Sequence, residues 1–90
     1  MSTVRIFTTR TCGYCVRAKQ FFESKGVDFE EIDVTGDDEA RQKLVRDSGG
    51  QRTVPQIWIG AFHVGGYTDL VKLDQDGKLD GVLSGASSSS

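Results

Sequence analysis

The only two cysteines of the chain, Cys12 and Cys15, stand where a strand pattern gives way to a helical one. Residues 3–8 have the pattern of a strand, and the residues after Gly13 place apolar side chains at helical spacing. The two residues between the cysteines set both sulfurs on one helix face, about one turn apart. A disulfide across so short a loop would stabilise the fold only weakly, so the pair predicts redox chemistry rather than a structural crosslink.

The rest of the chain alternates between strand and helix patterns. We expect strands over residues 3–8, 27–34, 56–59 and 62–64, and helices over residues 13–25, 38–47 and 68–76. Gly26 is placed to cap the first helix, and Thr68 to cap the third, with Asp69 in its first turn. The order β-α-β-α-β-β-α predicts an α/β fold with a four-stranded mixed sheet flanked by helices. The β-α-β unit gives a parallel pair, and the later hairpin gives an antiparallel one.

Length and composition narrow the class of protein. Ninety residues suffice for one small domain, expected over residues 1–84, and the Ser-rich residues 85–90 are expected to form a disordered tail. No apolar run reaches 18 residues and no signal peptide is evident, so we expect a cytoplasmic protein without a membrane partner. A net charge of −2 predicts no nucleic-acid partner.

Charge is distributed unevenly along the chain. Basic residues dominate residues 1–25, and acidic residues dominate residues 28–39. The surface around the cysteines is therefore either locally positive, which suits an anionic substrate, or neutralised where the two segments meet in the fold.

The two cysteines are expected to have unequal roles. Cys12 lies at the predicted start of a helix, where free backbone N–H groups, the helix dipole and the nearby Arg10 favour the thiolate. Cys15 lies one turn inside the helix and is expected to be more buried. Cys12 is thus the predicted nucleophile, and Cys15 the thiol that resolves the mixed disulfide. Tyr14 forms either an aromatic rim beside Cys12 or part of the core.

Zinc is the competing use of such a cysteine pair. A structural zinc site needs four ligands, and the chain offers two cysteines and one histidine, His63. His63 lies between Phe62 and Val64 on a predicted strand, where an ordinary strand residue is expected. We therefore expect no metal in the monomer.

Three segments resemble the motifs of glutaredoxins. Residues 11–15 (Thr-Cys-Gly-Tyr-Cys) resemble the dithiol active site, with glycine where proline is more common. Residues 53–55 (Thr-Val-Pro) and residues 65–69 (Gly-Gly-Tyr-Thr-Asp) resemble two further family motifs, and the likeness covers roughly residues 3–83. The resemblance implies a thioredoxin-like fold and a cis peptide bond before Pro55.

The resemblance also implies an activity. It implies a glutathione-dependent thiol–disulfide oxidoreductase that reduces glutathione mixed disulfides and protein disulfides through Cys12 and Cys15. The residues expected to bind glutathione are Arg10, Tyr14, Gln51, Arg52, Thr53, Val54, Pro55, Gly66, Thr68 and Asp69. Thr9 stands where many members of the family carry lysine, which leaves open whether Arg10 or Arg52 holds the glycyl carboxylate.

Two rival functions follow from the same residues. A thioredoxin-like reductant served by a flavin reductase would usually have tryptophan before the first cysteine and Gly-Pro between the pair, unlike Thr11, Gly13 and Tyr14 here. The other rival is an iron–sulfur module, in which Cys12 of two subunits and two glutathiones hold one [2Fe–2S] cluster. Gly13 favours this homodimer because proline is absent there, and otherwise a monomer is expected.

Overall fold

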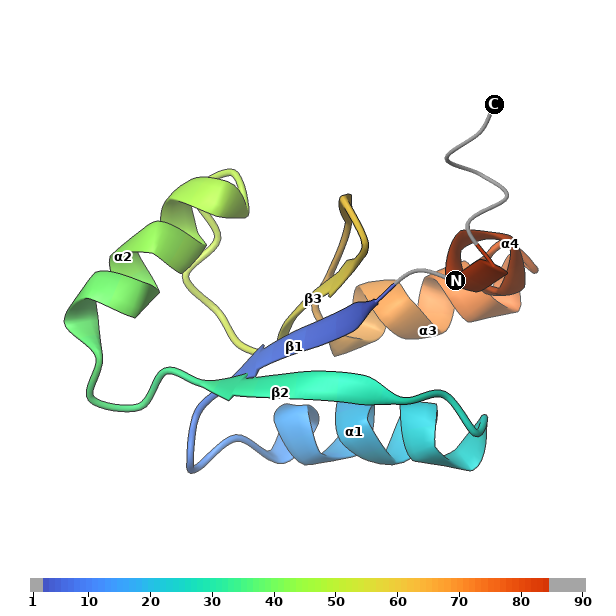
Figure 1. Cartoon of the computed structure of the whole chain (residues 1–90), viewed down its shortest axis with the longest axis horizontal. Coiled ribbons are helices and arrows are strands. Elements are labelled where there is room, and N and C mark those ends of the chain that lie inside the picture. The colour runs from blue at the N-terminus through green and yellow to red at the C-terminus, as the bar shows by residue number, and fades with distance from the viewer. Residues whose placement is uncertain (1–2, 85–90) are drawn as a thin grey trace.

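The structure, a computed structural model that describes residues 3–84, confirms the predicted order β-α-β-α-β-β-α and adds one short helix after it (Figure 1). The elements are β1 (Val4–Thr8), α1 (Gly13–Ser24), β2 (Phe29–Asp33), α2 (Asp38–Asp47), β3 (Gln56–Ile59), β4 (Phe62–Gly65), α3 (Tyr67–Gln75) and α4 (Leu79–Ser84). The expected tail over residues 85–90 lies outside the described residues.

The sheet has four strands in the order β2-β1-β3-β4. β1 pairs in parallel with β2, with Val4 opposite Phe29, and antiparallel with β3, with Phe7 opposite Gln56. β3 and β4 form the predicted hairpin. β3 is antiparallel to β1. The loop before Gln56 therefore lies at the same end of these two strands as the β1–α1 junction, which carries Cys12.

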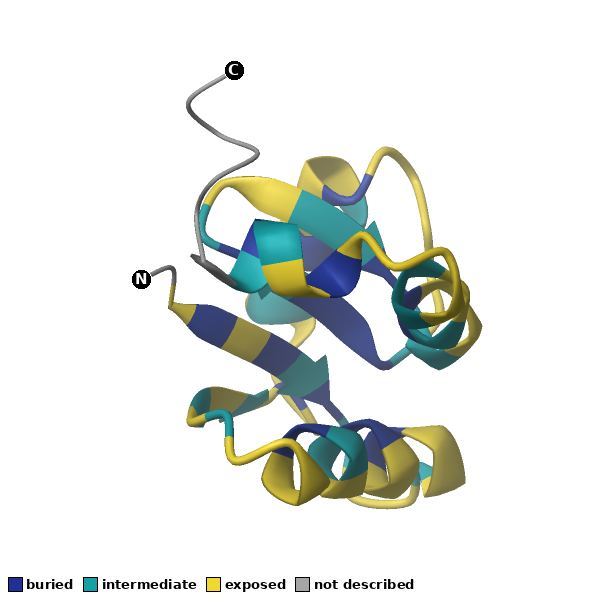
Figure 2. Ribbon diagram, turned by 90° about the vertical axis from the view of Figure 1, so that its right-hand side faces the viewer, coloured by how far each residue is buried: buried dark blue, intermediate teal, exposed yellow. Residues whose placement is uncertain are grey.

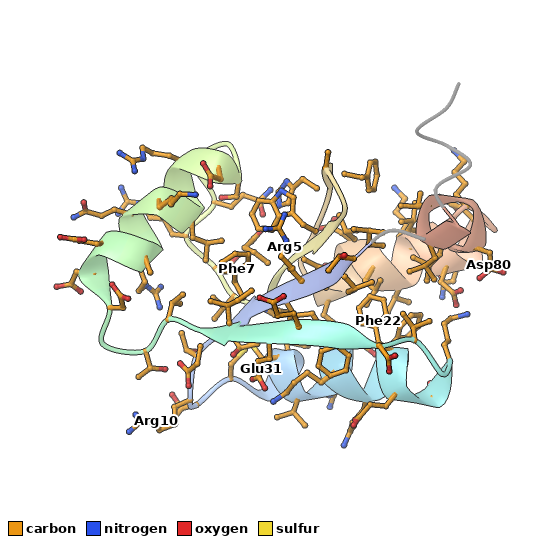
Figure 3. All side chains as sticks on the ribbon, in the orientation of Figure 1. Arg5, Phe7, Arg10, Phe22, Glu31 and Asp80 are labelled. Atoms are coloured by element: carbon orange, nitrogen blue, oxygen red, sulfur yellow. The ribbon has the colours of Figure 1, made fainter. Side chains whose placement is uncertain are left out.

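The main core lies between the sheet and the helices α1, α3 and α4. Side chains alternate along β1, so Val4 and Ile6 are buried while Arg5 is exposed, as the bands along this strand show (Figure 2). Phe22 of α1 lies on the core side, and Arg5 and Phe7 lie on the other (Figure 3). The buried cluster comprises Val4, Ile6, Ala18, Phe22, Ile57, Ile59, Leu70, Leu79 and Val82.

Two predicted boundaries differ from the observed ones. β2 begins at Phe29 rather than residue 27, because the Val27 N–H donates to the Phe22 carbonyl at 3.0 Å and closes the end of α1. The expectation that Thr68 caps the third helix is wrong. α3 begins at Tyr67 with Gly66 as its N-cap, because the Asp69 carboxylate accepts a hydrogen bond from the Gly66 N–H at 2.9 Å.

Between residues 3 and 84, no helix is both long and apolar enough to span a membrane.

Candidate redox site

Cys12 is the N-cap residue of α1 and is half-buried. Its backbone is extended, which turns the side chain toward the first turn of the helix, and its Sγ accepts a hydrogen bond from the Cys15 N–H at 3.1 Å. One otherwise unpaired N–H of the helix start therefore points at this sulfur. This is the contact expected for a cysteine at the start of a helix, and the thiolate form of Cys12 stays a prediction.

Cys15 is almost completely buried, with 1% of its surface exposed. Burial is the main reason that the pKa of its thiol is raised to about 12, and the hydrogen bond and charge of Cys12 raise it further. The Thr9 backbone and the Lys19 charge act in the opposite direction. Both cysteines are free thiols, so the site holds one accessible sulfur and one buried, protonated sulfur.

The loop before β3 lies directly against Cys12. The Val54–Pro55 peptide bond is cis, as the resemblance implies. The Cys12 thiol donates to the Val54 carbonyl at 3.6 Å, a contact between residues 42 positions apart. The antiparallel pairing of β1 with β3 thus brings the dithiol motif and the Thr-Val-Pro motif together at one end of the two central strands.

The glycine-rich third motif forms the start of α3. Gly65 has a φ of +110°, and a side chain there would overlap the Asp69 carboxyl group. A Cβ at Gly66 would lie 3.6 Å from the Pro55 carbonyl oxygen, so this turn is close to the cis-proline loop. Because residue 65 is glycine, the backbone can adopt this conformation and lie directly against the Asp69 carboxyl group. Asp69 and Thr68 are both exposed in the first turn of α3.

Tyr14 belongs to the rim of the site rather than the core. The residue is 56% exposed, and its ring stacks on that of Tyr67 with centroids 6.0 Å apart and planes inclined by 24°. The Arg17 guanidinium lies 5.8 Å from the centroid of the Tyr14 ring. The stack joins the starts of α1 and α3. Tyr67 was not predicted as a site residue, although it stands inside the third motif.

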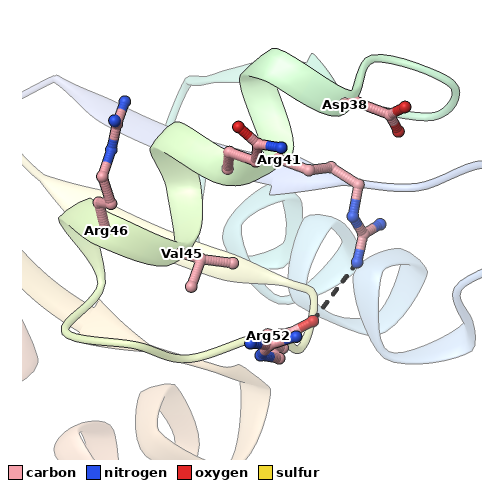
Figure 4. Close-up of a pocket in the computed structure, with 6 residues that line it drawn as sticks. Asp38, Arg41, Val45, Arg46 and Arg52 are labelled. Carbon is pink, nitrogen blue, oxygen red and sulfur yellow. Dashed lines mark hydrogen bonds between the residues drawn. The ribbon is translucent and has the colours of Figure 1, made fainter.

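Arg52 lines a groove against α2 (Figure 4). The groove is bounded by Asp38, Arg41, Gln42, Val45, Arg46 and Arg52. The Arg41 guanidinium donates to the Arg52 carbonyl oxygen at 3.4 Å. Arg41 was not predicted either, because nothing in the pattern of a charged helix shows which of its arginines faces the loop.

Within the described part of the chain, Arg10 is hydrogen-bonded to the segment after β2 and not to the cysteines. Its backbone N–H donates to Thr35 Oγ1 at 2.7 Å, and its exposed side chain extends into solvent (Figure 3). Hydrogen bonds from Thr35 lower the pKa of the Asp33 carboxyl group, and the charges of Arg10 and Lys19 lower it further. Among residues 3–84, the Arg10 side chain makes no hydrogen bond to Cys12 or Cys15.

Some of the basic charge near the cysteines is neutralised in the fold. Lys19 Nζ lies 2.9 Å from Glu31 Oε2, which also accepts a hydrogen bond from the buried Thr8 hydroxyl at 2.9 Å. The bond with Glu31 is the main cause of the raised pKa of Lys19, and the same bond lowers the pKa of Glu31. Lys25 and Asp74 form a further pair at 3.0 Å.

The described residues include no group of three or more histidine, cysteine and acidic side chains that could hold a metal ion.

Two neighbouring thiols that differ this much suit one kind of reaction. The half-buried sulfur of Cys12 can attack a disulfide, and the buried sulfur of Cys15 can act only after Cys12 has formed a mixed disulfide beside it. The fold and the site therefore define a thiol–disulfide oxidoreductase with a thioredoxin-like fold.

Comparison with known proteins places the chain in a family within that class. The glutaredoxin family model matches residues 4–64. Glutaredoxin of Pseudomonas aeruginosa is 55% identical over 84 residues, which cover 93% of this chain and 99% of the relative. Glutaredoxin 3 of Escherichia coli K12 is 47% identical over 83 residues, covering 92% of this chain and 99% of that one. The chain belongs to the glutaredoxin family, whose members are thiol–disulfide oxidoreductases.

Solved structures show the same fold. The buckwheat glutaredoxin–glutathione complex superposes with a TM-score of 0.83 at 34% identity, over 92% of this chain and 77% of that one. The solution structure of glutaredoxin from Brucella melitensis gives a TM-score of 0.81 at 46% identity, over 92% of this chain and 89% of that one.

Proposed function

We propose that this glutaredoxin reduces glutathione mixed disulfides and protein disulfides, with glutathione as the reductant, Cys12 as the nucleophile and Cys15 as the resolving thiol. The observation that carries the proposal is the inequality of the two sulfurs. Cys12 Sγ accepts a helix-start N–H and lies against the cis-proline loop, whereas Cys15 is buried with a pKa of about 12. The presence of glutathione in the buckwheat complex supports the choice of reductant.

The proposed reaction runs in two exchanges. The Cys12 thiolate attacks the glutathione sulfur of the mixed disulfide, a new S–S bond forms, and the substrate leaves as a thiolate that takes up a proton. The thiolate of a second glutathione then attacks the glutathione sulfur on Cys12, which releases oxidised glutathione and restores Cys12. With a protein disulfide, the Cys12 thiolate attacks one sulfur, and the other protein sulfur leaves as a thiolate that takes up a proton. Cys15 then loses its proton and attacks the Cys12 sulfur, which breaks the Cys12–protein bond and releases the second protein thiol. The intramolecular disulfide that results is reduced by two glutathiones.

The third motif provides groups for the γ-glutamyl end of glutathione. The first N–H groups of α3, from Tyr67 through Asp69, have no carbonyl partner within the helix and suit a carboxylate. The Asp69 carboxylate, already close to the Gly66 N–H, suits the neighbouring ammonium group. Thr68 belongs to this set as a member of the first turn, not as the cap.

The cis-proline loop provides groups for the remainder of the tripeptide. The backbone of Val54, between Thr53 and Pro55, can pair with an extended peptide in a β-like manner, beside the Cys12 sulfur. For the glycyl carboxylate we favour Arg52, with Gln51, over Arg10.

Two observations support this choice of cation. The guanidinium of Arg41 lies beside the Arg52 carbonyl and adds a second positive charge to the groove. The charge of Arg10 acts instead on the carboxyl group of Asp33.

The roles of the sulfurs are tested with two variants and one mass measurement. After exposure of the reduced protein to oxidised glutathione, we expect a single adduct on Cys12 in Cys15→Ser and an intramolecular disulfide in the wild type. Cys12→Ser should lose all turnover, and Cys15→Ser should retain deglutathionylation but lose reduction of protein disulfides. Full deglutathionylation by Cys12→Ser would refute the assignment.

Binding of a [2Fe–2S] cluster is a second candidate, supported by the position of the half-buried Cys12 thiol next to the exposed Gly13. Only Cys12 is accessible, so each chain fits one ligand, and a cluster would need a second chain and two glutathione thiols. The cluster would supply four sites for thiolate ligation. Anaerobic reconstitution with iron, sulfide and glutathione should give a coloured dimer in the wild type and not in Cys12→Ser. A colourless monomer from the wild type would reject this function.

We also propose that the chain works as a cytoplasmic monomer when it acts on disulfides. Both cysteines and all three motifs come from one chain, so the dithiol reaction needs no second subunit. A dithiol served by glutathione requires a reducing compartment. Sedimentation of the reduced protein as a single 9.8 kDa species would agree with this proposal, and a stable dimer without a cluster would contradict it.

A further inference from the structure

Gln56 is a fully buried polar residue directly after the cis proline. Its side chain is 0% exposed, yet it has a partner for each of its polar atoms. Nε2 donates to Gln51 Oε1 and to the Thr53 carbonyl, both at 3.0 Å, and lies 3.4 Å from Thr53 Oγ1. A buried amide with this many partners is costly to disturb, because each lost bond leaves a polar group without water.

These partners determine which way the amide faces. The Thr53 carbonyl can only accept, so the atom beside it must be the amide nitrogen of Gln56. Gln56 Oε1 then faces His63 Nε2 at 2.7 Å, and the histidine must be the donor of that bond. The hydrogen bonds therefore run in one direction, from His63 through Gln56 to the loop.

His63 is itself held in place. It lies opposite Trp58 in the β3–β4 pairing and stacks on the indole with ring centroids 4.4 Å apart. Trp58 in turn packs edge-on against Phe7 of β1 with centroids 5.3 Å apart. The donor is thus fixed by two strands of the sheet, whereas the acceptors belong to a loop.

The loop has little else to determine its conformation. Gln51, Arg52 and Thr53 are all exposed, so apolar packing contributes little to their placement. Two further anchors are the hydrogen bond that the Ser48 hydroxyl donates to the Gln51 carbonyl at 3.1 Å and the longer one that the Arg41 guanidinium donates to the Arg52 carbonyl at 3.4 Å. The bonds of Gln56 are therefore a main determinant of how residues 51–53 are presented next to Val54.

We propose that Gln56 and His63 act as a positioning pair that holds the segment Gln51–Thr53, and with it Val54, in the orientation that binds the glutathione moiety. The inference rests on the proposed function, because the ligand is the one assigned to this loop. Neither residue touches the reacting sulfurs. Their effect should appear in affinity for the glutathione-bearing substrate, not in the reactivity of Cys12.

The test is Gln56→Leu, which keeps the approximate volume and removes every hydrogen bond of the amide. We expect KM for a glutathionylated peptide to rise about tenfold with kcat within about twofold, as expected for loss of one or two hydrogen-bond contributions. The rate of Cys12 alkylation by iodoacetamide should be unchanged. Gln75→Leu, the same change at an exposed position near the end of α3, is the matched control and should leave both constants unchanged.

Variants of His63 separate positioning from general damage to the fold. His63→Leu removes the donor and should raise KM about fivefold, whereas His63→Gln keeps an N–H donor and should recover most of the affinity. An unchanged KM in Gln56→Leu, or a His63→Gln variant no better than His63→Leu, would overturn the proposal.

A second readout needs no glutathione. Backbone NMR order parameters of residues 51–54 should fall in Gln56→Leu from the rigid range near about 0.85 toward about 0.6, with β1 unaffected. Unchanged order parameters would overturn the positioning role. If the wild type instead shows no saturation with the glutathionylated peptide, the proposed function fails, and the NMR result still decides the role of the pair.

Discussion

At the scale of single residues, the site depends on where each sulfur lies relative to the first turn of α1. Cys12 precedes the helix, so its sulfur meets an N–H that no carbonyl can reach. Cys15 follows by one turn on the face that packs against the sheet, and burial raises the pKa of its thiol to about 12. The three-residue spacing thus gives two chemically different thiols.

This difference predicts how the thiols react with an alkylating agent. With a pKa of about 12, only about one Cys15 in ten thousand is ionised at pH 8. Iodoacetamide at pH 8 should therefore label Cys12 first, and labelling of Cys15 should rise about tenfold per pH unit up to pH 10. Mass spectrometry of the two cysteines after short pulses measures both rates. In 6 M guanidinium chloride the two should react alike, and equal labelling in the native protein would contradict the prediction.

The single histidine predicts a pH-dependent stability. Burial lowers the pKa of His63 in the folded state, and the Asp69 charge opposes this effect without reversing it. The unfolded chain therefore binds a proton near pH 6.5 that the folded chain resists, so the free energy of unfolding should fall as the pH drops below 6.5. Urea unfolding between pH 7.5 and 5.0 should show a steeper loss in the wild type than in His63→Gln. Parallel curves would contradict the prediction.

At the scale of elements, the start of α3 shows how much local sequence determines. Strands and helices follow from apolar spacing, and their order is enough to predict the sheet. The choice between Thr68 and Gly66 as N-cap is different, because it depends on Asp69 folding back onto the Gly66 N–H. A hydroxyl at the N-cap would accept from an N–H group of the first turn, whereas the Asp69 carboxylate binds the N–H of the cap residue itself, which can then be glycine.

A substitution at Gly65 tests this turn. Gly65→Ala would require a positive φ and would set a methyl group against the Asp69 carboxyl, so it should lower stability by roughly 2 kcal/mol and the melting temperature by about 10 °C. The matched control is Gly81→Ala in α4, where a Cβ meets nothing within 4 Å. That change should be neutral or stabilising by up to about 1 kcal/mol. Equal melting temperatures for the two variants would rule out the turn as described.

The side-chain contacts between different segments near the site could not be predicted from the sequence. Cys12, Cys15 and the cis-proline loop were predictable because each stands in a recognisable motif. The contact of Arg41 with the Arg52 carbonyl and the link from His63 to Gln56 join residues 11 and 7 positions apart on different segments. Their partners depend on how those segments pack, and no periodicity within either segment specifies that packing.

At the scale of the whole molecule, the net charge and the local charge around the proposed glutathione site have opposite signs. The chain carries a net charge of −2, which disfavours an anionic substrate at long range. Lys19 and Lys25 are paired with Glu31 and Asp74, so they contribute little to a positive field. The groove between α2 and the cis-proline loop instead has three arginines and one aspartate among its lining residues.

This distribution predicts that a local field, not the net charge, attracts glutathione. Replacing Arg41 and Arg52 together by glutamine should raise KM for a glutathionylated peptide about tenfold, because charge-assisted hydrogen bonds are lost at an exposed site. The decline of kcat/KM between 20 and 300 mM salt should also become shallower.

Lys72→Gln with Lys78→Gln removes the same two charges from exposed positions outside the groove, and neither lysine is in an ion pair within residues 3–84. This control should keep the wild-type KM and salt dependence. If the lysine pair changed KM and salt dependence as much as the arginine pair, net charge would explain both effects. The groove would then have no special part in binding. If only the arginine pair does so, the substrate is recognised by two guanidinium groups of the groove between α2 and the cis-proline loop, in a protein whose overall charge is negative.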